Sequence, residues 1–107
     1  MSEYAEVTKA AVELLNAHPR VAKAWKQSTG VYRGAGGSRV TVAPPGLPDI
    51  CGWMKDGRFI GIEVKRRDSD ARMSQAQLDV QHLLSVSRCV RGTITRPEQA
   101  VEILESA

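Results

Sequence analysis

Arg58-Phe59-Ile60-Gly61-Ile62-Glu63-Val64-Lys65 decides the fold, because its apolar and other residues alternate with a period of two. The three β-branched residues of this stretch share one face of an extended strand, and we expect that face to be buried. Glu63 and Lys65 share the opposite face, roughly 6.5–7 Å apart along the strand. A slip of one residue would expose the whole apolar set, so the positions of the two charged residues are fixed.

A second short strand over residues 49–54 precedes this one. Lys55-Asp56-Gly57 lies between them and is typical of a tight hairpin turn, so the two strands should be neighbours in one sheet. Asp49 follows Leu47-Pro48 and can then approach Glu63 across the strand pair. The sequence therefore predicts that two carboxylates and one lysine meet at one edge of a sheet.

The other expected elements follow from helical periodicity, caps and breakers. In the first half of the chain we expect a helix from the Ser2 cap to His18 with Tyr4 on its apolar stripe, a strand over residues 21–33 with a bulge or bend at Gly30, and a hairpin arm at Arg39–Ala43. In the second half we expect a helix from Ser74 to about Ser87, a strand from Cys89 to Thr95 and a short helix after Pro97. The order α-β-β-β-β-α-β-α is typical of an α/β domain with a central mixed sheet flanked by helices. A length of 107 residues suits a single domain over residues 1–107.

The composition excludes several classes of protein. Apolar residues make up 42% of the chain and charged residues 25%, which argues against a disordered chain. No apolar run approaches the ~20 residues that a membrane span needs. Residues 1–4 are acidic and lack the apolar segment of a secretory signal, so we expect a cytoplasmic protein. The two cysteines make no disulfide framework, and no Cys/His cluster has zinc spacing.

Charge is distributed unevenly along the chain, although the net charge is only +3. Residues 14–48 contain five basic residues and no acidic one, and residues 80–97 are likewise free of acids. Such a basic region attracts phosphate backbones, while a solvated surface of mixed charge explains the count equally well. The candidates for contacts with phosphate are Lys26, Arg33, Arg66 and Arg67.

Two carboxylates close together repel each other and favour a cation between them. A hard ion with oxygen ligands, Mg²⁺ or Mn²⁺, meets that demand, and a neighbouring lysine can position an attacking water. The alternative to a cation site is a turn that begins with a proline, beside an ordinary Glu-Lys pair on the surface. Gln77 lies near the start of the following helix, where it could reach the same edge, but Ser74-Gln75-Ala76-Gln77 is also a capping box. The two roles of Gln77 are compatible.

The sequence resembles the VRR-NUC branch of the PD-(D/E)xK nuclease superfamily. The resemblance covers about residues 3 to 104 and is carried, in order and spacing, by four segments: Trp25-Lys26-Gln27-Ser28-Thr29-Gly30, Gly46-Leu47-Pro48-Asp49-Ile50-Cys51-Gly52, Gly57 to Lys65, and Ser74 to Gln77. The short form of the chain is similar to the stand-alone, virus-type members. The resemblance implies a homodimer that holds branched DNA, and it is compatible with an intracellular protein of a viral or bacterial host cell.

The resemblance implies roles for individual residues. Asp49 and Glu63 would be metal ligands, with the backbone carbonyl of Val64 as a third. Lys65 would be the catalytic lysine and Gln77 the helix glutamine of the family. The family also uses an acid on the first helix, which would be Glu6 or, two turns further on the same face, Glu13.

The chain departs from the family pattern at two places. Ser28-Thr29-Gly30 stands where the family commonly has Asn-Thr-Gly, and Ser87-Arg88 stands where it often has two glycines. Neither change removes a carboxylate or the lysine, so they bear on loop geometry and substrate contacts. The implied activity is a Mg²⁺- or Mn²⁺-dependent DNA endonuclease, with a four-way (Holliday) junction as the favoured substrate. The alternatives are a non-catalytic DNA-binding module on the same fold and a subunit-interaction protein.

Overall fold

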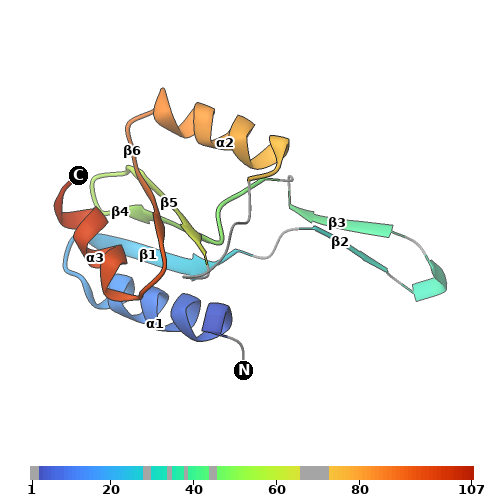
Figure 1. Cartoon of the computed structure of the whole chain (residues 1–107), viewed down its shortest axis with the longest axis horizontal. Helices are drawn as coiled ribbons and strands as arrows, with labels where there is room; N and C mark the ends of the chain where they lie inside the picture. Colours follow the sequence, from blue (N-terminus) through green and yellow to red (C-terminus); the bar gives the residue numbers. More distant parts are fainter. Residues whose placement is uncertain (1–2, 28–29, 34, 38, 44–45, 66–72) are drawn as a thin grey trace.

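The computed structural model describes residues 3–27, 30–33, 35–37, 39–43, 46–65 and 73–107. Along the chain lie α1 (Glu3–Ala17), β1 (Val21–Lys26), β2 (Gly30–Arg33), the short 3₁₀ turn η1 (Ala35–Gly37), β3 (Arg39–Ala43), β4 (Ile50–Met54), β5 (Phe59–Val64), α2 (Gln75–Ser85), β6 (Cys89–Ile94) and α3 (Glu98–Glu105) (Figure 1). None of the described helices has both the length and the apolar character needed to cross a membrane.

A mixed four-stranded sheet in the order β1-β4-β5-β6 forms the centre of the molecule. Strand β4 runs antiparallel to β1 and β5, whereas β6 runs parallel to β5. The expected hairpin joins β4 to β5, with Ile50 opposite Ile62 and with Gly57 at a positive φ of 94° in the turn. The predicted fold class, an α/β domain with a central mixed sheet flanked by helices, is confirmed.

Helices cover both faces of this sheet, but only one face carries the main core. Helices α1 and α3 lie on one side and α2 on the other (Figure 1). The β-branched residues of β5 belong to the core shared with α1 and α3 and are at most 3% exposed, as expected, but Gly61 and Glu63 between them are buried as well. By contrast, no residue of α2 is fully buried, and Leu78 and Leu83 are 49% and 62% exposed. The α2 side is thus the thinner layer of the fold.

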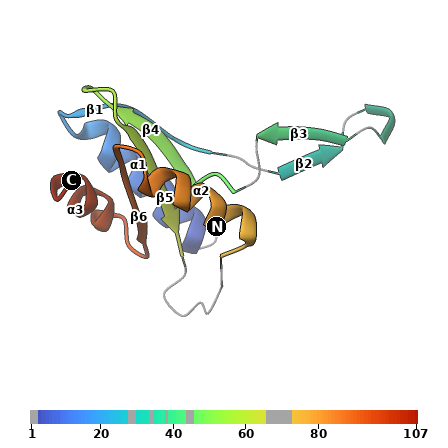
Figure 2. The same cartoon turned by 90° about the horizontal axis from the view of Figure 1, so that it is seen from above.

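The prediction of one strand over residues 21–33 is wrong. This segment forms two strands, β1 and β2, which belong to two different sheets. Strand β1 ends at Lys26, and the next residue, Gln27, donates its backbone N–H to the Asp49 carbonyl at 2.8 Å. Strand β2 pairs only with β3, in a separate ribbon whose register shifts between Gly30 and Val31. This ribbon projects from the body of the molecule (Figure 2). Residue propensities identify both segments as extended but cannot show that they pair with different partners.

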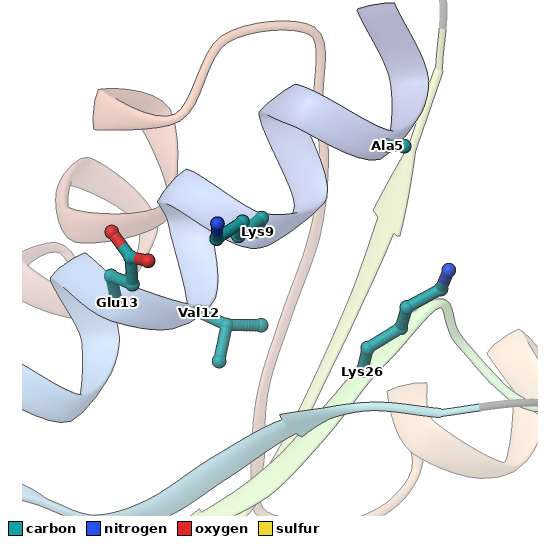
Figure 3. Close-up of a pocket in the computed structure, with 5 residues that line it drawn as sticks. All are labelled: Ala5, Lys9, Val12, Glu13 and Lys26. Atoms are coloured by element: carbon teal, nitrogen blue, oxygen red, sulfur yellow. The ribbon is translucent and has the colours of Figure 1, made fainter. Parts of the chain in front are cut away.

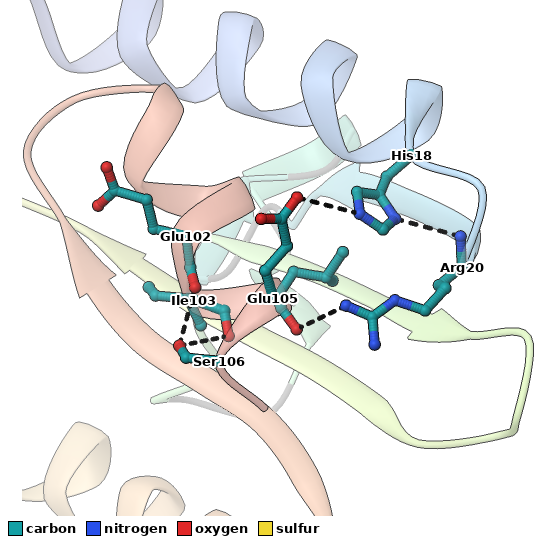
Figure 4. Close-up of polar contacts among 7 residues, drawn as sticks. His18, Arg20, Glu102, Ile103, Glu105 and Ser106 are labelled. Carbon is teal, nitrogen blue, oxygen red and sulfur yellow. Dashed lines mark hydrogen bonds and ion pairs between the residues drawn. The ribbon is translucent and has the colours of Figure 1, made fainter.

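Polar contacts tie the ends of α1 and α3 together (Figure 4). His18 accepts the Arg20 backbone N–H on Nδ1 at 3.1 Å, and its Nε2 lies 3.7 Å from a Glu105 carboxylate oxygen. The Arg20 guanidinium donates to the Leu104 carbonyl at 3.3 Å. These contacts hold the C-terminal end of α1. Its N-terminal end lies at the opposite end of the strands, where Tyr4 contacts Asp49.

Candidate active site

Asp49 and Glu63 lie side by side on neighbouring segments of the sheet. Asp49 immediately precedes β4, and Glu63 is the fifth residue of β5, one position beyond the Ile50–Ile62 pair. The backbone N–H of Asp49 donates to Oε1 of Glu63 at 3.2 Å. The hairpin register therefore brings two carboxylates to one place at the end of the strand pair.

The loop before Asp49 is held by close packing on α2 and β5. Gly46 has a φ of +88°, and a Cβ at this position would collide with the backbone carbonyl of Ala76 in the first turn of α2. Pro48 is fully buried, and a Cβ at Gly61 of β5 would lie only 3.0 Å from its ring. Glycine at position 46 thus allows the loop to approach α2, and proline fixes the direction in which Asp49 leaves it.

The carboxylate of Asp49 accepts two hydrogen bonds from two other elements. The Tyr4 hydroxyl of α1 donates to Oδ1 at 2.6 Å, and the Val64 backbone N–H donates to Oδ2 at 2.8 Å. A bond of 2.6 Å is in the range of charge-assisted O–H···O⁻ bonds. Asp49 is therefore oriented from both sides, by a helix 45 residues earlier in the chain and by the strand that carries Glu63.

Glu63 is completely buried and is oriented by α2. The Gln77 side-chain amide donates to its Oε2 at 2.8 Å. The Gln77 amide oxygen accepts the Ser74 backbone N–H at 3.0 Å, while the Ser74 hydroxyl accepts the Gln77 backbone N–H at 3.2 Å. The capping box is thus present, and the same glutamine also contacts Glu63. Gln77 therefore caps the helix and reaches the carboxylate site, as expected.

The charges in this cluster perturb one another. Burial and the charge of Asp49 raise the pKa of Glu63, while Lys65 and the Asp49 N–H act in the opposite direction. Lys65 stands two residues after Glu63, directly after the end of β5 at Val64. Burial and the same two carboxylates raise the pKa of the Cys51 thiol to about 11, so Cys51 is a packed, protonated residue and not a nucleophile. Burial and Asp49 also raise the pKa of Tyr4, which stays a hydrogen-bond donor.

Hydrogen bonds join Asp49, Glu63, Gln77 and the backbone N–H of Val64, and Lys65 follows Val64 directly in the chain. The structure does not bring Glu6 to them: Glu6 is exposed and lies on the far side of α1 from Tyr4, and Glu13 shares that side. In the part of the chain that the structure describes, no three Asp, Glu, His or Cys side chains form a metal-binding group. The carboxylate pair is thus completed from α1 by a phenol.

Tyr4 is the site residue that sequence reasoning missed, because the helical stripe assigned it to the core. The available signal was its place at the N-terminal end of that stripe, where a phenol can pack its ring and still extend a hydroxyl outward.

The residues expected to contact phosphate are spread over several elements. Lys26 is exposed at the end of β1. Arg33 lies in β2, directly opposite Arg39 of β3 in the ribbon register. Arg66 and Arg67 lie outside the described residues.

Comparison with known proteins identifies the fold. No protein family model matches the sequence, and no curated protein matches it. A solved structure described as a VRR_NUC domain is similar to this chain with a TM-score of 0.63 and 19% sequence identity, over 98% of this chain and 97% of that chain. The expected resemblance is confirmed at the level of architecture: this chain has the fold of a VRR_NUC domain along nearly its whole length.

Proposed function

We propose that this protein is a divalent-cation-dependent endonuclease that hydrolyses phosphodiester bonds in DNA at the Asp49–Glu63–Lys65 cluster. The observation that carries the proposal is the pair of acidic residues on adjoining segments of the sheet, joined by the bond from the Asp49 N–H to the Glu63 carboxylate at 3.2 Å, with Lys65 two residues after Glu63 in the chain. Likeness to a VRR_NUC domain over 98% of the chain supports the same assignment.

The donor set fits a hard cation such as Mg²⁺ or Mn²⁺. An ionised carboxylate has about four acceptor sites, and the structure gives two protein donors to each of Asp49 and Glu63. Each side chain therefore keeps oxygen lone pairs for an ion. Mg²⁺ is commonly held by one or two carboxylates and retains several waters, so a third acidic ligand is not required. The carbonyl of Val64 is the third protein ligand in this proposal.

The protein groups divide the remaining work. A bound cation would lower the pKa of a coordinated water and offset negative charge on the phosphate. Tyr4 and the Val64 N–H hold the Asp49 carboxylate in one orientation, and Gln77 does the same for Glu63. In this proposal Lys65 would hold the attacking water and stabilise the additional negative charge that develops in the transition state. The role of Glu6 in orienting the site stays a prediction from the family resemblance.

DNA as the substrate is supported by the distribution of basic residues. Residues 14–48 include no acid, and they supply β1 and the projecting ribbon β2–β3. We extend the proposal to branched DNA, with a four-way junction as the preferred form, and to a homodimer. Such a junction presents equivalent strands, so paired cuts require two copies of the site.

One assay tests the activity directly: purified protein with linear, flapped and four-way DNA in Mg²⁺, Mn²⁺ or EDTA. We expect cleavage with either metal, none in EDTA, and fastest cleavage of the four-way junction. Lys65→Ala should retain the fold and DNA binding but lose cleavage. Lys55→Ala is the matched control, since Lys55 is an exposed lysine in the β4–β5 turn, at the far end of the same hairpin. Unchanged cleavage by Lys65→Ala would contradict the mechanism.

The same preparations distinguish the non-catalytic alternative. Calorimetric titration of Mn²⁺ into wild type and Asp49→Ala measures whether the cation binds at the carboxylates. DNA binding without cleavage, together with no Asp49-dependent Mn²⁺ binding, would identify a DNA-binding module on a nuclease fold. Light scattering with and without junction DNA measures the oligomeric state, and a monomer in both conditions would contradict the homodimer.

A further inference from the structure

We infer that the groove between α1 and β1 binds the DNA strand beside the phosphate under attack, with Lys9 and Lys26 pairing with its phosphates. The groove has a volume of about 470 Å³ and is lined by Ala5, Lys9, Val12, Glu13 and Lys26. This inference rests on the proposed function, because it takes the Asp49–Glu63 pair as the point of cleavage.

The groove has an apolar base and a charged rim (Figure 3). Val12 reaches from α1 toward β1 and packs partly against the core, and Ala5 lies near the start of the helix. Lys9 comes from α1 and Lys26 from β1, so the two ammonium groups stand on opposite walls. An apolar base with basic walls matches a nucleic-acid strand, whose sugars are largely apolar and whose phosphates are anionic.

The groove adjoins the carboxylate site at both of its walls. Ala5 follows Tyr4, whose hydroxyl donates to Asp49 at 2.6 Å. Lys26 precedes Gln27, whose backbone N–H donates to the Asp49 carbonyl at 2.8 Å. A strand that leaves a phosphate at Asp49 toward the α1 side of the sheet therefore enters this groove.

The two lysines are available for phosphate. Both are exposed, and none of the ion pairs among the described residues involves Lys9 or Lys26, although Glu13 lies one turn from Lys9. The spacing also fits: five residues of helix separate Tyr4 from Lys9, which is about 7.5 Å of rise. Successive phosphates advance about 3.4 Å per nucleotide in a stacked strand, so Lys9 stands about two phosphates from the site. Glu13, further along α1, marks the end of the favourable region.

The test compares lysines on the two faces of β1. Affinity for four-way and single-stranded DNA is measured by fluorescence anisotropy in EDTA, over a range of salt, for wild type, Lys9→Gln, Lys26→Gln and Lys23→Gln. Lys23 is exposed on the same strand but lies outside the groove, opposite Trp53, so it is the matched control. We expect Lys9→Gln and Lys26→Gln each to reduce the slope of log K against log salt by about 1, and Lys23→Gln to leave it unchanged.

Charge-retaining variants separate a phosphate contact from a structural effect. Lys9→Arg and Lys26→Arg should bind with nearly the wild-type slope. If Lys9→Gln and Lys26→Gln behave like Lys23→Gln, the groove does not bind DNA and the inference is overturned. If wild type fails to cut any DNA with Mg²⁺ or Mn²⁺, the proposed function fails, and the slopes still report whether the groove binds DNA.

A neutral phosphate gives the position of the contact. Once the cut is mapped with wild type, methylphosphonates are placed at the first and second phosphates on either side of it. On one side, the substitution should weaken wild type but not Lys9→Gln, because that variant has already lost the partner. Equal sensitivity of wild type and Lys9→Gln at every position would contradict the assignment of Lys9.

Discussion

The backbone N–H of Asp49 donates to the buried carboxylate of Glu63 at 3.2 Å, so the two acids are bonded although their charges repel. The backbone hydrogen bond fixes the relative position of the two residues. The repulsion between their negative charges calls for positive charge nearby. Lys65 supplies part of it. The site is thus built to gain stability from a cation, and its hydrogen bonds keep it assembled before the cation binds.

Mn²⁺ should stabilise the folded protein through these two carboxylates. An ion that binds only the folded state at 100 times its Kd raises the free energy of unfolding by about 2.7 kcal/mol. We expect a rise in Tm of several degrees for wild type and none for Asp49→Asn or Glu63→Gln, measured by calorimetry with and without Mn²⁺. A full rise in both variants would place the binding site elsewhere.

The stability of the metal-free protein should depend on pH through Glu63. Burial and Asp49 raise its pKa above the ordinary 4.5, so the folded protein holds this proton more tightly than the unfolded chain. The stabilisation is therefore complete below pH 4.5 and is lost as the pH rises through the folded pKa.

Urea unfolding in EDTA between pH 4 and 8 measures this effect. Wild type should lose stability relative to Glu63→Gln as the pH rises. Wild type should show no such loss relative to Glu102→Gln, which changes an exposed glutamate of α3 and retains Glu63. Parallel curves for wild type and Glu63→Gln would mean that Glu63 is not the group that titrates.

Tyr4→Phe removes a single hydroxyl and leaves Asp49 without one of its two protein donors. We expect a loss of about 1.5–3 kcal/mol in the free energy of unfolding, typical of a lost bond to a charged group. Cleavage should also slow, because Asp49 becomes free to rotate.

A double-mutant cycle with Asp49→Asn isolates the Tyr4–Asp49 contact by urea denaturation. The two substitutions should be non-additive, since either one removes the same bond. Strict additivity would show that the hydroxyl and the carboxylate do not interact in solution.

Gln77 takes part in the helix cap and orients Glu63, and different variants can separate these two roles. Ser74→Ala removes the helix cap but keeps the Gln77 amide beside Glu63, so it should cost about 1 kcal/mol of stability and leave most of the cleavage. Gln77→Ala removes both contacts of the Gln77 side chain, the bond to Glu63 and the bond from the Ser74 N–H, and should reduce cleavage as well. Gln81→Ala, one turn further along α2, is the control. Equal cleavage by the Ser74 and Gln77 variants would assign Gln77 to capping alone.

The parts of the site that sequence predicts are those fixed by local patterns. Alternation in β5 places Glu63 and Lys65, the hairpin at Lys55-Asp56-Gly57 brings Asp49 back to Glu63, and the capping box identifies the start of α2. Each relationship spans at most a few turns or one strand pair, so spacing alone determines it.

Tyr4 and the split of residues 21–33 depend on tertiary docking. Tyr4 meets Asp49 only because α1 packs along the sheet, 45 residues away in sequence. Strand β1 stops at Lys26 because β4 supplies its partner only that far, and the ribbon then pairs with itself. Neither event leaves a periodic mark in the sequence, so neither the Tyr4–Asp49 contact nor the break between β1 and β2 follows from the spacing of residues.

The projecting ribbon should contribute DNA contacts through Arg33 and Arg39. Their Cα atoms are partners in the β2–β3 register, and like charges directly opposite each other destabilise a strand pair unless an anion joins them. Arg33→Ala and Arg39→Ala should therefore each reduce the salt slope of DNA binding by about 1, without loss of stability in free protein. The control is Arg88→Ala, an exposed arginine just before β6, at the end of the sheet away from Lys65. Slopes unchanged in both ribbon variants would show that DNA does not reach the ribbon, and would confine binding to the body of the molecule.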